Sequence, residues 1–109
     1  MDLRRGVVAT AAPPGSFSKP RPVLVIEDEA GSFTETVTVA LITSDLLRRP
    51  AVRVPITPSA SNGLRIPSEV MVDIIQTLPK QRQGRVIGNV DAVTLRQVDA
   101  ALRLHLGLP

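Results

Sequence analysis

Arg21 is the residue of this sequence best placed to bind a negatively charged group. It stands in the run Lys19-Pro20-Arg21-Pro22, directly before the apolar residues 23–26. Pro22 biases Arg21 toward extended backbone, and the unbroken apolar run is typical of a strand buried on both faces. An arginine at the mouth of such a strand offers a planar fork that suits a phosphate better than lysine would. The run therefore predicts a phosphate-binding side chain, although a solubilising charge at a strand end explains the same pattern.

Other residue types that carry enzyme chemistry are scarce. The chain has no cysteine and one histidine, His105, which leaves no thiolate and few candidate metal ligands. His105 falls in the last turn of an expected helix, where a cation complements the helix dipole. No glycine-rich phosphate loop, nucleophile elbow or paired-carboxylate motif is present in the sequence. We therefore expect no metal and no cofactor, and a reaction whose nucleophile belongs to the substrate.

Positive charge is concentrated in the middle of the chain. The net charge is only +3, but residues 46–90 contain seven basic residues against two acidic ones, Glu69 and Asp73. This stretch predicts a surface for a polyanion or an acidic partner, with an ordinary solvated arginine surface as the alternative. Phe17 and Phe33 are the only aromatic residues, so an extended base-stacking platform is excluded.

Length and hydropathy limit the class of protein. The 109 residues suit one domain, 1–109, that can bury a core without disulfides or metal. No segment approaches the roughly 20 apolar residues of a membrane helix, and the first residues are charged at Asp2, Arg4 and Arg5. We therefore expect a cytoplasmic protein with no membrane association.

Short apolar and alternating segments predict a mainly β fold with one helix. Pro55 marks an edge strand, Ser44-Asp45 is expected to cap a short helical turn, and Asp91 is expected to cap a longer helix that ends at Gly107. These elements favour a small curled antiparallel barrel with a helix packed on it. The expected strands are 6–11, 23–26, 36–42, 52–56, 69–73 and 85–88, and the apolar stripe of the helix is Leu95, Val98, Leu102 and Leu106.

The order and spacing of five segments resemble the MazF/PemK family of toxins, over nearly the whole chain. The resemblance implies a CcdB/PemK-like, SH3-like barrel with a C-terminal helix. The segments are Arg5-Gly6-Val7-Val8, Arg21-Pro22-Val23-Leu24-Val25-Ile26, Val37-Thr38-Val39-Ala40-Leu41-Ile42-Thr43-Ser44, Pro67-Ser68-Glu69-Val70-Met71-Val72-Asp73 with Thr77 after it, and Ile87-Gly88 before the closing helix.

This resemblance also implies a function. Such a toxin is a sequence-specific endoribonuclease that cuts single-stranded messenger RNA and is neutralised by a cognate antitoxin peptide. The family further implies a homodimer with RNA in a groove between the protomers. Cleavage is then metal-independent: the 2′-hydroxyl of RNA attacks the neighbouring phosphodiester, and the protein aligns the groups and stabilises the developing charge. The products carry a 2′,3′-cyclic phosphate and a 5′-hydroxyl.

The resemblance assigns site residues by position. The catalytic arginine and threonine of the family match Arg21 and Thr43, and Asp73 falls where some relatives carry a functional acid. We expect these three side chains to converge near one phosphate, with Asp73 as general base or as a partner that orients Arg21. The expected RNA-binding residues are Phe17, Lys19, Arg48, Arg49, Arg53, Arg65 and Thr77.

Departures from the family pattern keep other functions open. Val7 replaces a common acid, the first loop has Gly15-Ser16-Phe17 without acid or histidine, and Gln76 replaces a frequent arginine. A catalytically silent barrel that only binds antitoxin or RNA is one alternative. A non-enzymatic gyrase poison resembling CcdB is another, but those toxins act through a tryptophan-glycine-isoleucine ending. This chain ends in Leu106-Gly107-Leu108-Pro109 and has no tryptophan, which favours the nuclease.

Overall fold

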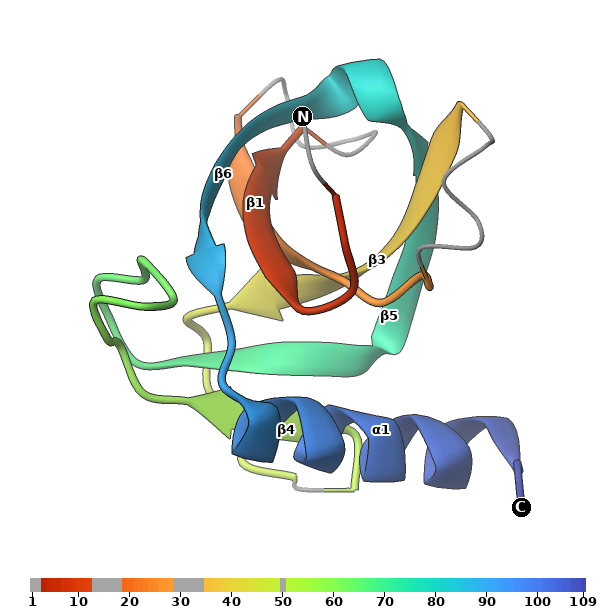
Figure 1. Cartoon of the computed structure of the whole chain (residues 1–109). Coiled ribbons are helices and arrows are strands. Elements are labelled where there is room, and N and C mark those ends of the chain that lie inside the picture. Colours follow the sequence, from red (N-terminus) through yellow and green to blue (C-terminus); the bar gives the residue numbers. More distant parts are fainter. Residues whose placement is uncertain (1–2, 13–18, 29–34, 50) are drawn as a thin grey trace.

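A curled six-stranded antiparallel sheet and one C-terminal helix make up the fold (Figure 1). The computed structural model describes residues 3–12, 19–28, 35–49 and 51–109. The strands follow the order β4-β5-β3-β2-β1-β6 across the sheet. Their bounds are β1 Val7–Ala11, β2 Arg21–Val25, β3 Thr36–Thr43, β4 Arg53–Ile56, β5 Ser68–Pro79 and β6 Gln83–Asn89, with the 3-10 turn η2 Lys80–Arg82 before β6 and the helix α1 Ala92–Leu106 after it.

The sheet curls into a ring in Figure 1, with β4 and β6 as its two edges. Within the described ranges no ladder joins these two edges, so closure into a barrel is not detected. The predicted mainly β fold with a C-terminal helix is confirmed, and β4, which contains Pro55, is an edge strand as expected.

The strands in the middle of the sheet bury side chains on both faces. Val23, Leu24 and Val25 of β2 have no exposed surface. Leu24 belongs to the apolar cluster that includes Val98 of α1, whereas Val23 and Val25 belong to a second cluster with β1 and the first half of β3. This double burial explains the unbroken apolar run of β2. It also fixes the backbone of the strand on which Arg21 is the first residue.

Strand β5 is longer than predicted and bends sharply in its middle (Figure 1). On β3, Leu41 pairs with Met71 of β5, whereas the preceding residue Ala40 pairs with Ile75 of β5. Residues 72–74 of β5 therefore have no partner on β3. Such a bulge interrupts the two-residue alternation of buried side chains. The sequence pattern therefore predicted a strand that ends at Asp73, whereas β5 continues to Pro79.

Residues 44–49, which follow β3, are not helical, so the predicted helical turn capped by Ser44-Asp45 is wrong. The carboxylate of Glu69, only 3% exposed, accepts the backbone N–H of Leu47 at 2.8 Å and of Arg48 at 3.0 Å. Arg48 has a φ of 60°, a left-handed conformation that a right-handed helix excludes. Two charge-assisted hydrogen bonds thus hold this segment against β5.

The helix α1 begins and ends where the sequence predicts. Asp91 Oδ1 accepts the backbone N–H of Thr94 at 2.7 Å, and this bond holds the pKa of Asp91 below its usual value. Gly107 closes the helix with a φ of 67°. An ion pair between Arg5 and Asp99 also ties the helix to the residues before β1.

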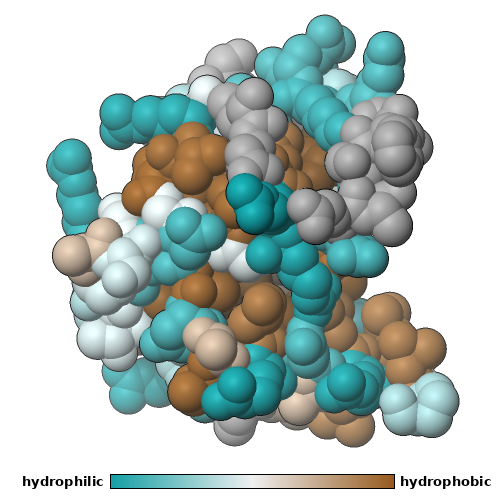
Figure 2. All heavy atoms as spheres, viewed as in Figure 1, coloured by the Kyte–Doolittle hydropathy of each residue, from teal (hydrophilic) through white to brown (hydrophobic). Residues whose placement is uncertain are grey.

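One face of α1 packs on β4 and β5 through Val98 and Ala101. Leu106, which the pattern placed in the buried stripe, is exposed together with Leu104 and Leu108. Figure 2 shows apolar side chains gathered at this end of the helix. No helix described in the structure is long and apolar enough to span a membrane.

Candidate active site

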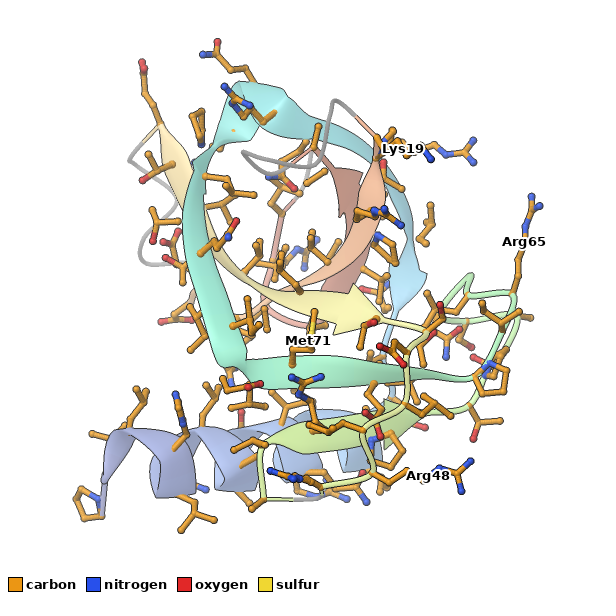
Figure 3. All side chains as sticks on the ribbon, turned by 180° about the vertical axis from the view of Figure 1, so that it is seen from behind. Lys19, Arg48, Arg65 and Met71 are labelled. Carbon is orange, nitrogen blue, oxygen red and sulfur yellow. The ribbon has the colours of Figure 1, made fainter. Side chains whose placement is uncertain are left out.

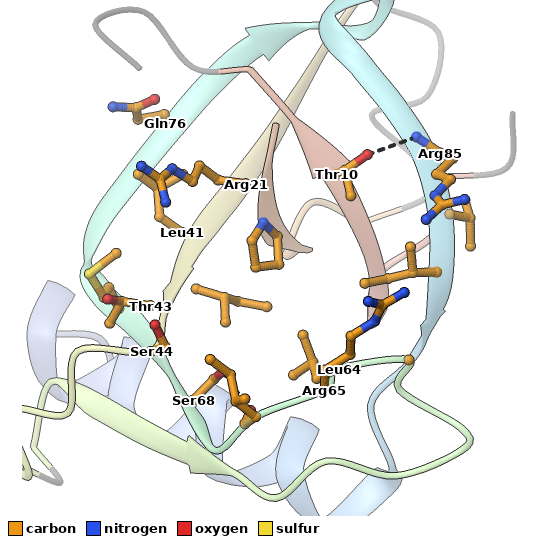
Figure 4. A pocket seen from close by; sticks show the side chains of 17 residues that line it. Thr10, Arg21, Leu41, Thr43, Ser44, Leu64, Arg65, Ser68, Gln76 and Arg85 are labelled. Carbon is orange, nitrogen blue, oxygen red and sulfur yellow. Dashed lines mark hydrogen bonds between the residues drawn. The ribbon is translucent and has the colours of Figure 1, made fainter. Parts of the chain in front are cut away.

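A cavity of about 910 Å³ lies between the start of β2, the end of β3, strand β6 and the segment 57–67 (Figure 4). Its lining includes three arginines, Arg21, Arg65 and Arg85, together with the hydroxyl groups of Thr10, Thr43, Ser44 and Ser68. No lining residue that the structure describes is acidic. The cavity therefore favours an anionic ligand.

Arg21 and Thr43 lie on adjacent strands and line the same cavity. The β2–β3 ladder pairs Val23 with Leu41, and Arg21 and Thr43 each lie two residues beyond this pair. Residues two apart on a strand share a face of the sheet, and both side chains line the cavity (Figure 4). The structure therefore places these two predicted catalytic residues in one cavity.

Thr43 is oriented by its own turn. Its Oγ1 accepts the backbone N–H of Asp45 at 3.0 Å. A hydroxyl has one hydrogen to donate and two lone pairs to accept with. The bond from Asp45 uses a lone pair of the oxygen and not its hydrogen, so the hydroxyl can still donate to an anion in the cavity.

Two glycines let the segment 57–67 approach β6 and form the opposite wall. A Cβ at Gly63 would lie 2.1 Å from the carbonyl oxygen of Ile87, and one at Gly88 would lie 2.3 Å from that of Ser61. The backbone N–H of Asn89 also donates to Ser61 at 2.8 Å. Only glycine permits this contact, because the neighbouring atoms belong to the backbone and cannot rotate away.

Asn62 gives the same segment its internal structure. Its side chain is 5% exposed, and Oδ1 accepts the backbone N–H groups of Ser59 and Leu64, both at 3.0 Å. Its Nδ2 donates to the carbonyl of Thr57 at 2.9 Å. The segment is therefore a defined wall, and it places Arg65 across the cavity from Arg21 (Figure 4).

Asp73 does not line the cavity. It lies in the bulge of β5, where its carboxylate accepts Nε of Arg53 at 3.0 Å and Nη2 at 3.3 Å. Partial burial acts to raise the pKa of Asp73, but the hydrogen bonds from Arg53 and the local backbone, with the charges of Arg53 and His105, hold it below the usual value. A carboxylate with a low pKa is a weak base. The expected convergence of Asp73 with Arg21 and Thr43 is not found.

Among the expected RNA-binding residues, Arg65 lines the cavity and Lys19 is exposed just before β2. Figure 3 shows Lys19 beside the start of β2, and Arg48 far from it beside β4. Arg49 is exposed in the same segment as Arg48. Phe17 falls outside the described residues.

The remaining two expected RNA-binding residues have partners on neighbouring strands. Arg53 pairs with Asp73, as described above. Thr77 Oγ1 lies 2.9 Å from Thr38 Oγ1, which places its hydroxyl in a cross-strand hydrogen bond. Neither residue belongs to the lining of the cavity.

Arg85 and Gln76 line the cavity but were not predicted as site residues. The backbone N–H of Arg85 donates to Thr10 Oγ1 at 3.1 Å, which joins β6 to β1 beside the cavity (Figure 4). Gln76 Oε1 is buried and has no hydrogen-bond partner in the described part of the chain. The sequence showed a basic residue in a short strand at Arg85, but it gave no sign that this strand pairs with β1.

Across the described ranges, no group of three or more His, Asp or Glu residues could hold a metal ion.

A sequence profile of the PemK-like, MazF-like toxins of type II toxin-antitoxin systems matches residues 4–106. The chain belongs to this family. It is 35% identical over 107 residues to the probable endoribonuclease MazF of Mycolicibacterium smegmatis, with 97% of this chain and 98% of that protein covered. It is 30% identical over 94 residues to the endoribonuclease MazF9 of Mycobacterium tuberculosis, with 81% and 79% covered.

Solved structures agree with this membership. An endoribonuclease from Mycobacterial species, in complex with its cognate antitoxin, superposes with a TM-score of 0.83 at 28% identity and covers 99% of this chain and 98% of that one. The Mycobacterium tuberculosis toxin MazF-mt6 gives a TM-score of 0.81 at 33% identity, with 94% and 98% covered. The chain is thus a homologue of MazF endoribonucleases, and the predicted family, enzyme class and MazF-like fold are confirmed.

Proposed function

We propose that this MazF homologue is a metal-independent, sequence-specific endoribonuclease that cleaves single-stranded RNA in the cavity between Arg21 and Arg65. The 2′-hydroxyl gives up its proton to water as its oxygen attacks the adjacent phosphorus, the bond to the 5′ oxygen breaks, and the leaving 5′ oxygen takes up a proton from water. The products are a 2′,3′-cyclic phosphate and a 5′-hydroxyl.

Arg21 and Thr43 are the catalytic residues of this proposal. The Arg21 guanidinium binds the non-bridging oxygens of the phosphate in two contacts, and the Thr43 hydroxyl donates to the same group. Both act more strongly as negative charge builds on the pentavalent phosphorus, so they stabilise the transition state more than the ground state. Asp73 has a structural role here, as the partner of Arg53.

The observation that carries the proposal is the composition of the cavity. Three arginines and a threonine with a free hydroxyl hydrogen face a space whose described lining has no carboxylate. An RNA phosphate is attracted there, and a divalent metal ion would meet no carboxylate ligand. Arg65 and Arg85, across the cavity, are suited to the neighbouring phosphates of the RNA strand.

The test is cleavage of a long RNA by the purified protein in EDTA, with the new ends identified by mass spectrometry. We expect a cyclic phosphate and a 5′-hydroxyl. A 5′-phosphate end, or cleavage that requires added Mg²⁺, would contradict the mechanism.

The proposal also includes two partners. A cognate antitoxin peptide neutralises the toxin, in keeping with the relative solved in complex with its own antitoxin.

The toxin itself is a homodimer, and the exposed Leu104, Leu106 and Leu108 at the end of α1 offer apolar surface for a second protomer. Light scattering coupled to gel filtration should give twice the mass of one chain at micromolar concentration, and a strictly monomeric mass would contradict the dimer.

A further inference from the structure

Gln76 lines the cavity, and its side-chain oxygen has no hydrogen-bond partner among the residues that the structure describes. Gln76 lies on the second half of β5, opposite Val39. Figure 4 shows the Gln76, Arg21 and Leu41 side chains on the same side of the cavity. Gln76 Oε1 is buried, and no described residue donates a hydrogen bond to it. A buried acceptor without a donor weakens the folded state, whereas a ligand that supplies the donor is bound more tightly.

The chemistry of this acceptor limits what it can bind. The oxygens of an RNA phosphodiester are themselves acceptors, so Gln76 Oε1 cannot bond to the group that Arg21 attracts. An exocyclic amino group of a nucleobase is a donor of the required kind. A glutamine amide pairs its oxygen with such an amino group and its nitrogen with the neighbouring ring nitrogen.

The surroundings of Gln76 suit the face of a base. The bulge in β5 places Met71 opposite Leu41, so both apolar side chains line the cavity on the same side as Gln76. Thioether and aliphatic groups pack well against a flat ring. The other two arginines, Arg65 and Arg85, lie on the opposite side of the cavity (Figure 4).

We propose that Gln76 is a specificity-determining residue, and that it selects a base with an exocyclic amino group in the nucleotide next to the phosphate held by Arg21. Leu41 and Met71 contact the face of this base, and the Gln76 amide reads its edge. The inference rests on the proposed function, since it takes RNA as the ligand.

The experiment compares the wild-type protein with Gln76→Met, which keeps the length of the side chain and removes the amide. Gln97→Met, at an exposed position of α1, is the matched control. Each protein is given a randomised RNA library, and the cleaved ends are sequenced. The same library with 2′-O-methyl riboses, which cannot form the cyclic phosphate, is sorted by binding and sequenced in parallel.

We expect the wild-type protein and Gln97→Met to prefer an amino-bearing base at one position by roughly 5- to 100-fold. Gln76→Met should lose this preference and keep the rest of the motif. Replacing the preferred base by its deaminated form, inosine for adenine or uracil for cytosine, should weaken wild-type cleavage by the same factor. The melting temperature of Gln76→Met should not fall, because no protein hydrogen bond is removed.

The two arms separate this inference from the proposed function. An unchanged motif in cleavage by Gln76→Met would overturn the inference and leave the nuclease standing. Amino-base selection in the binding arm without any cleavage would keep the inference and overturn the nuclease. A wild-type protein that prefers no amino-bearing base in either arm would overturn the inference.

Discussion

Replacing Asp73 by asparagine separates a structural carboxylate from a general base. The substitution keeps the shape of the side chain and removes the charge that pairs with Arg53. The two side chains are 30% and 13% exposed, and ion pairs near the surface contribute about 0.2–1 kcal/mol. We therefore expect the free energy of unfolding at pH 7 to fall by about 0.5 kcal/mol. The cleavage rate should stay within about twofold of wild type, whereas loss of a general base costs roughly 100- to 10,000-fold.

The pH dependence of stability gives a second readout. The pKa of Asp73 is lowered in the folded state, so its ionised form stabilises the protein above the unfolded pKa, and this contribution is lost as the pH falls through the folded pKa. The stability difference between wild type and Asp73→Asn should hold from pH 7 to about 5 and shrink toward zero below about pH 4.

Urea unfolding and cleavage of an RNA oligonucleotide, measured on the same preparations, provide the assay. Glu35→Gln, at an exposed position, controls for the loss of one negative charge. A hundredfold loss of activity in Asp73→Asn with unchanged stability would refute the structural role, because that result would mean that the Asp73 carboxylate takes part in proton transfer.

Three further substitutions test the hydrogen bonds of Glu69, one wall of the cavity and the second catalytic residue. Glu69→Gln should lower the free energy of unfolding by about 1.5–3 kcal/mol in urea titrations, because the amide can no longer accept both backbone N–H groups. Gly88→Ala should cost about 1–3 kcal/mol and also slow RNA cleavage, because its Cβ pushes the segment 57–67 away from β6. Thr43→Val should slow cleavage by about tenfold with an unchanged circular dichroism spectrum, since a neutral donor is weaker than a guanidinium. Wild-type rates in either of the last two variants would count against the site.

The fold was predictable wherever the determining contacts are local or periodic. The unbroken apolar run of β2 predicts its burial on both faces, and Asp91 and Gly107 predict the two ends of α1. The bend in β5 was not predictable, because the bulge at residues 72–74 hides the alternation. The segment before β4 was mistaken for a helical turn because its conformation depends on Glu69, more than twenty residues away along the chain.

The candidate site was predictable only in part, for a related reason. The resemblance to the MazF/PemK family supplied Arg21 and Thr43, and both line the cavity. Arg85 and Gln76 enter the cavity through pairing partners and a bulge that no local pattern reveals. Position in the family also suggested Asp73, but its pairing with Arg53 depends on the neighbouring edge strand.

The central claim is that Arg21 stabilises the charge that develops on the scissile phosphate without a metal ion. The direct measurement is the single-turnover cleavage rate of one RNA in EDTA, for wild type, Arg21→Ala and the exposed control Arg96→Ala, with folding checked by circular dichroism. We predict a wild-type rate that EDTA does not change, a loss of roughly 100- to 1000-fold in Arg21→Ala and a wild-type rate in the control. Full activity in folded Arg21→Ala, or loss of wild-type activity in EDTA, would contradict this metal-independent role of Arg21.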